Sequence, residues 1–215
     1  MDEKRCVVLG AASLSEAALF YAGLRPNDLL LCADGGLRHA LTFGLRPRAL
    51  IGDGDSGGAI PPQGIESLRL PIRKDRTDTH ACIDYGLAHG CRNFLLLGCA
   101  GGPRLDHFMG NLCLLEYCAE HNARARLLDG DNECLLHTGG SLSLPEAARY
   151  RYVSLFPLDA EITGVTLEGL EYPLRDATLR RDTPVAVSNQ PDPKAPLVRV
   201  ALTGRALIIF SERLT

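Results

Sequence analysis

The sequence has no long hydrophobic run and no concentration of positive charge. Its first residues, Met1-Asp2-Glu3-Lys4-Arg5, lead into only a few apolar residues, too few for a signal-peptide core or a membrane span. The net charge is -3, with 23 Lys and Arg against 26 Asp and Glu, which gives no support to a nucleic-acid-binding or membrane-binding surface. We therefore expect a cytoplasmic protein with no nucleic-acid partner and no membrane partner.

Several familiar site patterns are also missing. The 8 cysteines include no Cys-x-x-Cys pair, so a structural zinc site is disfavoured and buried, reduced thiols are the better interpretation. The glycine-rich stretches match neither Gly-x-x-x-x-Gly-Lys-Ser/Thr nor Gly-x-Gly-x-x-Gly, so the sequence predicts neither a Walker-type loop nor a dinucleotide-binding loop. There is no internal repeat and no low-complexity segment.

The chain is long enough for one large domain or two small ones, with 215 residues of which 46% are hydrophobic. Up to residue 132, apolar runs alternate with helical patterns. We expect strands at 6–9, 29–33, 49–51, 65–72, 94–97 and 126–128. We expect helices at 14–22 with Ser13 as N-cap, 37–43, 79–89 with Thr77 or Asp78 as cap, and 105–119, where Leu105, Phe108, Leu112 and Leu115 form one apolar stripe.

From residue 133 onward, short β-type runs are separated by turn residues. They cover 134–137, 152–156, 165–167, 185–187, 197–202 and 206–210, and Thr203-Gly204-Arg205 reads as a hairpin turn. The predicted fold is an α/β N-terminal domain with a mostly parallel sheet, residues 1–132. It is followed by a small all-β antiparallel sandwich, residues 133–215.

Carboxylates and glycines gather in short clusters after the predicted strands. The clusters are Ala33-Asp34-Gly35-Gly36, Gly52-Asp53-Gly54-Asp55-Ser56, Lys74-Asp75-Arg76-Thr77-Asp78, Gly101-Gly102-Pro103-Arg104-Leu105-Asp106-His107 and, more weakly, Asp129-Gly130-Asp131. Loops after parallel strands meet in the crevice beyond the carboxyl ends of the sheet. Converging carboxylates there would repel one another without a cation, so the arrangement predicts a hard metal ion and a phosphate-bearing substrate.

Each cluster has a plainer interpretation when it is taken alone. Asp53 and Asp55 could share a divalent ion, but a single Asp-x-Asp is more often an acidic turn. Asp34 could cap the following helix, and one acid of the 74–78 cluster could serve as a helix cap. Glycine-rich backbone before a helix, with Arg104, suits an anion. His107 is either a base or a hydrogen-bond donor to phosphate, or it is a surface histidine with a structural hydrogen bond. Together these parts describe phosphoryl-type transfer.

With these motifs in order, the chain resembles the thiamine pyrophosphokinase family. Ala-Asp-Gly-Gly, Gly-Asp-x-Asp-Ser, Lys-Asp-x-Thr-Asp and Gly-Gly-x-Arg-x-Asp-His occur in the family's order, and the β-rich part carries Ser188-Asn189. The resemblance implies transfer of the pyrophosphoryl group of ATP to the hydroxyl of thiamine, giving thiamine diphosphate and AMP. It also implies a homodimer, with thiamine sites at the junction between subunits.

The resemblance further implies a role for each matching residue. Asp34, Asp53, Asp55 and Asp78 would gather around Mg²⁺, and Asp53, Asp55, Asp78 and Arg104 would be catalytic. ATP would be bound by Asp34, Gly35, Lys74, Thr77, Gly102, Arg104, Asp106 and His107, and thiamine by Lys74, Ser188 and Asn189. ATP and the metal belong to 1–132 and thiamine to 133–215.

The sequence departs from the family pattern at three places. There is no tryptophan, so the indole that covers thiamine in some relatives is missing. Thr79-His80 stands where many relatives carry Glu after Thr-Asp, and Pro191, Pro193 and Pro196 crowd the segment after Asn189. The alternatives are therefore a pyrophosphokinase for another hydroxymethyl acceptor such as a pterin, a non-catalytic thiamine- or nucleotide-binding protein, and a metal-dependent phosphohydrolase.

Overall fold

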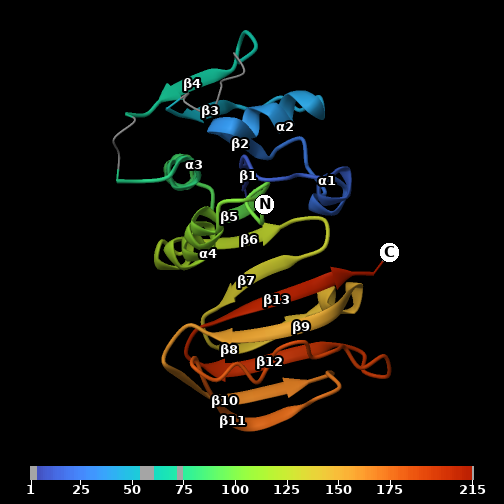
Figure 1. Cartoon of the computed structure of the whole chain (residues 1–215). Coiled ribbons are helices and arrows are strands. Elements are labelled where there is room, and N and C mark those ends of the chain that lie inside the picture. The colour runs from blue at the N-terminus through green and yellow to red at the C-terminus, as the bar shows by residue number, and fades with distance from the viewer. Residues whose placement is uncertain (1–3, 54–60, 72–74, 215) are drawn as a thin grey trace. The chain divides into compact units, whose positions relative to one another are not determined.

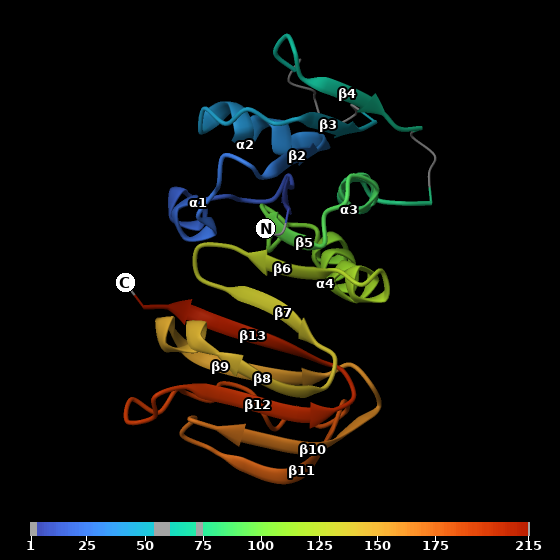
Figure 2. The same cartoon turned by 180° about the vertical axis from the view of Figure 1, so that it is seen from behind.

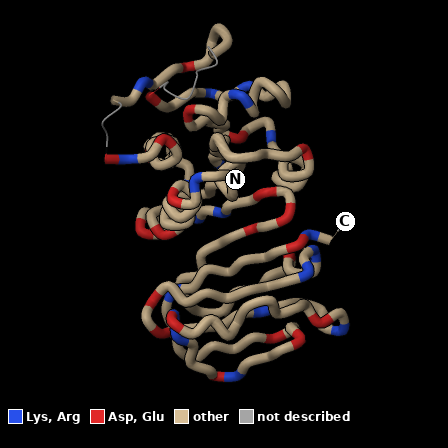
Figure 3. The backbone as a smooth tube through the Cα atoms, in the orientation of Figure 1, with Lys and Arg blue, Asp and Glu red and all other residues tan. Residues whose placement is uncertain are grey.

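The computed structural model describes residues 4–53, 61–71 and 75–214 (Figure 1). The chain divides into two compact units, Met1–Gly130 and Asp131–Thr215. Lys and Arg are interspersed with Asp and Glu along the chain that Figure 3 draws. Among the described residues, no helix has both the length and the apolar character needed to cross a membrane.

The first unit is a parallel sheet with helices on both faces. Its strand order is β4 (Glu66–Arg69), β3 (Ala49–Gly52), β2 (Leu29–Ala33), β1 (Arg5–Leu9), β5 (Asn93–Leu97) and β6 (Arg124–Leu128), and every neighbouring pair is parallel. Helices α1 (Glu16–Ala22) and α2 (Leu37–Thr42) lie on one face (Figures 1 and 2). Helices α3 (Asp78–Ala88) and α4 (Leu105–Glu120) lie on the other. The chain order reverses between β1 and β5, and a crevice forms at such a reversal.

The central strands are buried on both faces, as their continuous apolar runs predict. Val7 and Leu97 belong to one buried cluster with Leu37 of α2. On the opposite face α3 lies so close that a Cβ added to Gly86 would be 2.6 Å from the ring of Phe94. This packing fixes the strand ends, and therefore the loops that follow them.

The second unit is an antiparallel β-sandwich. One of its sheets has the order β7 (Glu133–His137), β13 (Ala206–Arg213) and β9 (Tyr150–Pro157). The other has β11 (Leu174–Arg180), β10 (Glu161–Glu168), β12 (Val198–Thr203) and β8 (Gly140–Leu144). Leu155 and Ile208 of the first sheet share one buried cluster with Val165 and Val200 of the second. The predicted fold class is confirmed for both halves of the chain.

The predicted hairpin at Thr203-Gly204-Arg205 is wrong, because β12 and β13 belong to different sheets. The turn carries the chain from one sheet of the sandwich to the other. The Arg205 N–H donates to Asp159 Oδ2 at 2.7 Å, and the Arg205 carbonyl accepts from the Leu158 N–H at 2.9 Å. The turn is therefore fixed by a different loop and not by pairing of its two flanking strands.

Three other local predictions are also corrected. Ser15, not Ser13, caps α1, since its Oγ accepts the Ala18 N–H at 3.1 Å. Residues 185–187 are not a strand, because the left-handed backbone of Ser188, with φ of 58°, follows them. Leu105 is 71% exposed, so the buried stripe of α4 lies further along, at Leu114, Leu115 and Cys118. Strands β8 and β11 were not expected, because half of their residues are polar.

Candidate active site

A cavity of about 710 Å³ lies in the first unit, at the carboxyl ends of its strands. Its walls come from the loops after β1, β2, β3 and β5 and from the beginnings of α3 and α4. The lining residues are Gly10, Ala11, Ala12, Ala33, Asp34, Asp53, Asp75, Arg76, Thr77, Asp78, Thr79, Gly98, Cys99, Gly101, Gly102, Pro103, Arg104, His107, Phe108 and Asn111.

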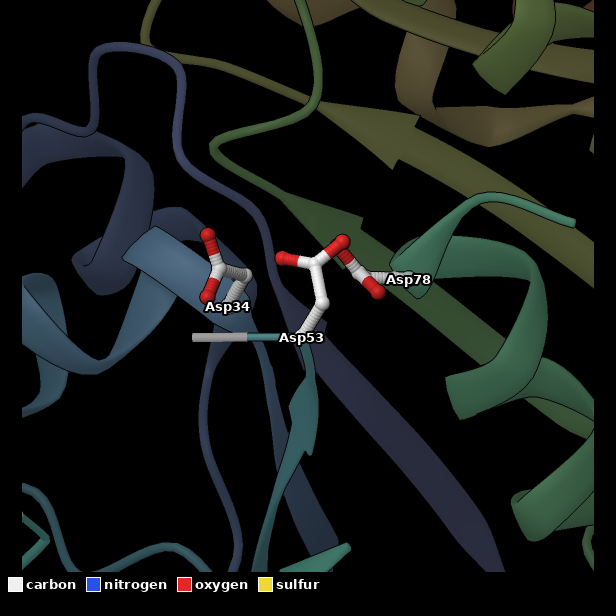
Figure 4. A group of neighbouring side chains, drawn as sticks. All are labelled: Asp34, Asp53 and Asp78. Atoms are coloured by element: carbon white, nitrogen blue, oxygen red, sulfur yellow. The ribbon is translucent and has the colours of Figure 1, made fainter. Parts of the chain in front are cut away.

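Three of the four carboxylates predicted to bind metal meet in this cavity. Asp34, Asp53 and Asp78 each offer one oxygen, and these oxygens lie within 4.8 Å of one another. Figure 4 shows the three side chains side by side, with Asp53 between the other two. Asp55 lies outside the described residues. Carboxylate oxygens are the ligands of hard divalent cations such as Mg²⁺, so the donor set fits such an ion.

Asp34 and Asp53 can approach because Gly52 has no side chain. A Cβ added to Gly52 would lie 2.8 Å from the Cβ of Asp34. Asp34 directly follows β2 in a left-handed conformation, with φ of 40°, and opens the 3-10 turn Asp34–Gly36 that leads into α2. Neither this turn nor α2 has a side-chain cap, so Asp34 does not serve as the cap that the sequence left open.

Asp78 enters the cavity from the first position of α3. The cap of this helix is Thr77, whose Oγ1 accepts the His80 N–H at 3.2 Å. No acid of the 74–78 cluster is therefore needed as the N-cap, and Asp78 is directed to the carboxylate group instead. A negative charge in the first turn is also favoured by the helix dipole. Lys74 lies outside the described residues.

Arg104 reaches the cavity from the loop before α4, and Asp106 holds it. The carboxylate of Asp106 accepts from Nε at 2.9 Å and from Nη2 at 2.6 Å, a bidentate pair. The pair holds the pKa of Asp106 far below its usual value and raises that of Arg104. Asp106 is not among the lining residues, so the structure gives it the position of a support for Arg104.

The other predicted nucleotide residues divide into two groups. Thr77, Gly102 and His107 line the cavity, and Gly101 and Gly102 have left-handed backbones, with φ of 69° and 82°. Gly35 is buried and is not among the residues that line the cavity. A Cβ added to Gly35 would lie 2.9 Å from the Cβ of Ala11. Gly35 thus allows the turn after β2 to pack under the turn after β1.

The loop after β1 also lines the cavity, and no sequence motif indicated it. Ala11 and Ala12 line the cavity, and the Ala12 N–H donates to the Gly98 carbonyl at 2.8 Å. From α4, Asn111 Nδ2 donates to the Cys99 carbonyl at 2.9 Å, which ties that helix to the loop after β5. The available signal was positional: Gly10 follows a buried strand, as Asp34 and Asp53 do.

Ser188 and Asn189 lie in the second unit, where Asn189 contacts the backbone of Tyr172. Asn189 is 6% exposed, and its Oδ1 accepts from the Tyr172 N–H at 3.0 Å while its Nδ2 donates to the Tyr172 carbonyl at 2.7 Å. Ser188 is exposed, and its N–H donates to Ser154 Oγ at 2.9 Å. The Asn189 side chain thus binds the protein's own backbone at Tyr172, a residue that is 64% exposed.

Comparison with known proteins decides which family has this arrangement. A family model described as "Thiamin pyrophosphokinase, catalytic domain" matches residues 22–127, and one described as "Thiamin pyrophosphokinase, vitamin B1 binding domain" matches residues 141–204. The chain belongs to the thiamine pyrophosphokinase family. It is therefore an enzyme of the kinase type, a transferase of thiamine diphosphate biosynthesis.

Individual relatives agree with the family match. Thiamine pyrophosphokinase of Bacillus subtilis (strain 168) is 29% identical over 169 residues, which cover 76% of this chain and 78% of the relative. The crystal structure of thiamine pyrophosphokinase from Bacillus subtilis superimposes with a TM-score of 0.85 at 24% identity, over 98% of this chain and 100% of the other. Thiamin pyrophosphokinase from Candida albicans, at 15% identity, has a TM-score of 0.79 over 97% and 90%. Both structures share the fold of this chain.

Proposed function

We propose that this chain transfers the pyrophosphoryl group of ATP to the hydroxyl of thiamine, giving thiamine diphosphate and AMP. The observation that carries the proposal is the meeting of Asp34, Asp53 and Asp78 beside Arg104, in one cavity of a chain that belongs to the thiamine pyrophosphokinase family. Acids alone would repel a triphosphate. Acids that hold a cation, next to a fixed guanidinium, attract it.

The metal in this proposal is Mg²⁺, held by Asp34, Asp53 and Asp78, with Asp55 as a further ligand from outside the described residues. When bound, it supplies positive charge to the phosphate oxygens. Mg²⁺ binds through few carboxylates and completes its octahedron with water and substrate phosphates, which matches this half-exposed acid group.

The rest of the cavity binds and orients the nucleotide. Arg104, held in one orientation by Asp106, donates to phosphate oxygens, and Gly102 and His107 lie beside it. Thr77 directly precedes Asp78 and Lys74 lies four residues before it, and both are assigned to the transferred group. Because phosphoryl transfer needs positioning and charge neutralisation more than covalent chemistry, no dedicated general base is required.

Apart from Lys74, the residues assigned to thiamine lie in the second unit, in keeping with the division proposed for 1–132 and 133–215. Ser188 is exposed, whereas Asn189 acts indirectly by fixing both backbone groups of Tyr172. We assign to Tyr172 the aromatic contact that tryptophan makes in some relatives. Tyr172 is 64% exposed and its backbone is held by Asn189, so its ring can stack on the pyrimidine or thiazolium of thiamine.

Substitution of Tyr172 tests this assignment. Tyr172→Ala should raise the KM for thiamine about tenfold, since a stacked aromatic contact and its buried area are lost, while the KM for ATP stays unchanged. Tyr172→Phe keeps the ring and should keep the wild-type KM. Equal thiamine KM values in all three proteins would show that this ring does not touch the substrate.

Identification of both products tests the function itself. The protein is incubated with ATP and Mg²⁺, with thiamine or with a hydroxymethylpterin, and the nucleotide and acceptor products are separated. We expect AMP and thiamine diphosphate. AMP formation with the pterin alone would support the other acceptor, and phosphate release without any acceptor would support a phosphohydrolase. Ligand binding with no AMP would indicate a sensor.

The homodimer belongs to the same proposal and rests on the family resemblance. Sedimentation velocity of the full chain should give the mass of two copies, and a single-copy mass at assay concentration would remove the homodimer from the proposal.

A further inference from the structure

Arg76 lines the same cavity as the three carboxylates, yet no motif assigns it a role. It lies in the loop before α3, two residues ahead of Asp78. Its side chain is 60% exposed, so by itself it would sample many rotamers and lose that freedom on binding a ligand. What distinguishes Arg76 from an ordinary surface arginine is the way in which it is held.

Asp84, near the middle of α3, accepts from Arg76 Nη1 at 2.5 Å through Oδ2. Its other oxygen, Oδ1, accepts from the hydroxyl of Tyr117 on α4 at 2.6 Å. The hydrogen bond to Asp84 raises the pKa of Tyr117 above its ordinary value, so the hydroxyl remains a donor. The Asp84 carboxylate is thus held by its own helix, α3, and by Tyr117 of α4, and this fixed carboxylate binds the guanidinium of Arg76.

His80 of α3 packs against both Tyr117 and Asp84. Its ring lies edge-on against the Tyr117 ring, with the centroids 4.3 Å apart, and its Nε2 is 3.9 Å from Asp84 Oδ1. The packed ring restricts Tyr117, and Tyr117 in turn restricts Asp84. A guanidinium carries five donors in a planar fork, so a bond through Nη1 leaves capacity for phosphate oxygens.

We infer that Arg76 binds the polyphosphate of ATP, and that Asp84 and Tyr117 are positioning residues that hold its guanidinium at the cavity wall. The inference rests on the proposed function for the identity of the nucleotide. Arg76 and Arg104 then contact the phosphates from the loops before α3 and α4. Each is held by an aspartate of the helix that follows its loop, Asp84 in α3 or Asp106 at the start of α4.

The chain contains a matched control group outside the cavity. Arg48 Nη1 lies 3.0 Å from Glu66 Oε2, and the Tyr85 hydroxyl donates to the same oxygen at 3.1 Å. This group again consists of an arginine, a carboxylate and a tyrosine, although here the tyrosine belongs to α3. None of the three residues lines the cavity. Substitutions there remove the same kinds of contact with no route to the nucleotide.

The experiment measures binding of a non-hydrolysable ATP analogue with Mg²⁺ by calorimetry, and KM and kcat for ATP and thiamine. We expect Arg76→Ala to weaken analogue binding about tenfold, as the loss of a hydrogen bond to a charged group does. Asp84→Asn and Tyr117→Phe should each weaken it about threefold, leave the KM for thiamine unchanged, and have no further effect in an Arg76→Ala background. Glu66→Gln and Tyr85→Phe should bind like the wild type.

The inference is overturned if Asp84→Asn and Tyr117→Phe change only the melting temperature, as the control pair does, or if Arg76→Ala binds the analogue normally. Tyr117→Phe removes a single oxygen and keeps the packed ring, so it remains informative if Asp84→Asn fails to fold. Absence of thiamine-dependent AMP formation in the wild type would instead remove the proposed function, and analogue binding would still decide the role of Arg76.

Discussion

Asp53 lies between Asp34 and Asp78, and its charge opposes both. At the 4.8 Å that bounds their oxygens, two unit charges repel by roughly 3 kcal/mol at an effective dielectric near 20. A protein would gain stability by losing one of these acids unless a cation offsets the repulsion. The three carboxylates are therefore expected to lower the folding stability of the metal-free protein and to raise that of the metal-bound protein.

Replacement of Asp53 separates these two effects. In chelator, Asp53→Asn removes one of three repelling charges, so it should lose less melting temperature relative to the wild type than it does with Mg²⁺. With Mg²⁺ the wild type should gain melting temperature and the variant should gain less, and kcat should fall by about 100-fold or more. Thermal melting with and without Mg²⁺ checks this. Glu120→Gln, an exposed acid at the end of α4, should match the wild type in all conditions. A variant destabilised equally with and without Mg²⁺ would contradict a metal role.

Single residues were predictable where a local rule applied to them. Thr77 has the sequence of a helix cap, and Asp34 and Asp53 follow buried strands, so their places in the crevice followed from topology. The pairing of Arg104 with Asp106 depends on side-chain rotamers that no motif encodes. The prediction that Asn189 touches thiamine rests on the family motif, whereas no motif indicates its hydrogen bond to the backbone of Tyr172, 17 residues away in sequence.

The loops that follow the strands carry the site residues, and the close packing of these loops determines where the carboxylates lie. The end of β3, at Gly52, lies against Asp34 in the turn after β2, and only a glycine at position 52 allows this approach. An alanine there would place its Cβ 2.8 Å from the Cβ of Asp34 and 3.0 Å from its Cα. Since a backbone atom cannot rotate away, the two loops would have to separate.

Two glycine substitutions distinguish this approach from general loss of glycine. Gly52→Ala should reduce kcat about tenfold or more and destabilise the fold by about 1–3 kcal/mol, because the metal ligands are pushed apart. Gly110→Ala, within α4 and with no atom within 4 Å of the added Cβ, should stabilise by about 0.5–1 kcal/mol and keep full activity. Activity assays and urea unfolding of both variants check this. Full activity of Gly52→Ala would mean that the loops are not coupled.

Helices and strands that are marked by a strong local sequence pattern were predictable. Strands and turns that depend on partners distant in sequence were not. The continuous run Phe94–Leu97 and the capped helix after Thr77 lie where the sequence places them. Strand β8 has serines at alternate positions and pairs with β12, which lies far along the chain. The turn at Gly204 resembles a hairpin locally, but Arg205 bonds to Asp159 instead.

The whole molecule carries eight reduced cysteines, and seven of them are buried, with Cys113 exposed. Burial raises the pKa of Cys32, Cys99 and Cys118 to about 12, from an ordinary value of 9.0. The folded protein therefore keeps these protons at a pH where the unfolded chain releases them. The resulting stability is fully present below pH 9 and is lost as the pH rises toward 12.

Urea unfolding between pH 7.5 and about 10.5 tests this linkage. Above pH 9, each of the three thiols should lower the free energy of unfolding by about 1.4 kcal/mol per pH unit. Above pH 9, the free energy of unfolding of Cys32→Ala should fall less steeply with pH than that of the wild type, because one thiol is missing. Below pH 9 the two proteins should show the same pH dependence. Identical slopes in the two proteins would show that Cys32 is not a buried, protonated thiol.

The account of the whole enzyme is tested most directly by the fate of the terminal phosphate of ATP. ATP labelled with ³²P in its γ-phosphate is incubated with the protein, thiamine and Mg²⁺, and the products are separated with and without chelator. We predict that the label enters thiamine diphosphate, that AMP forms in equal amount, and that chelation stops both. Label in inorganic phosphate, ADP as the nucleotide product, or undiminished transfer in chelator would contradict the account.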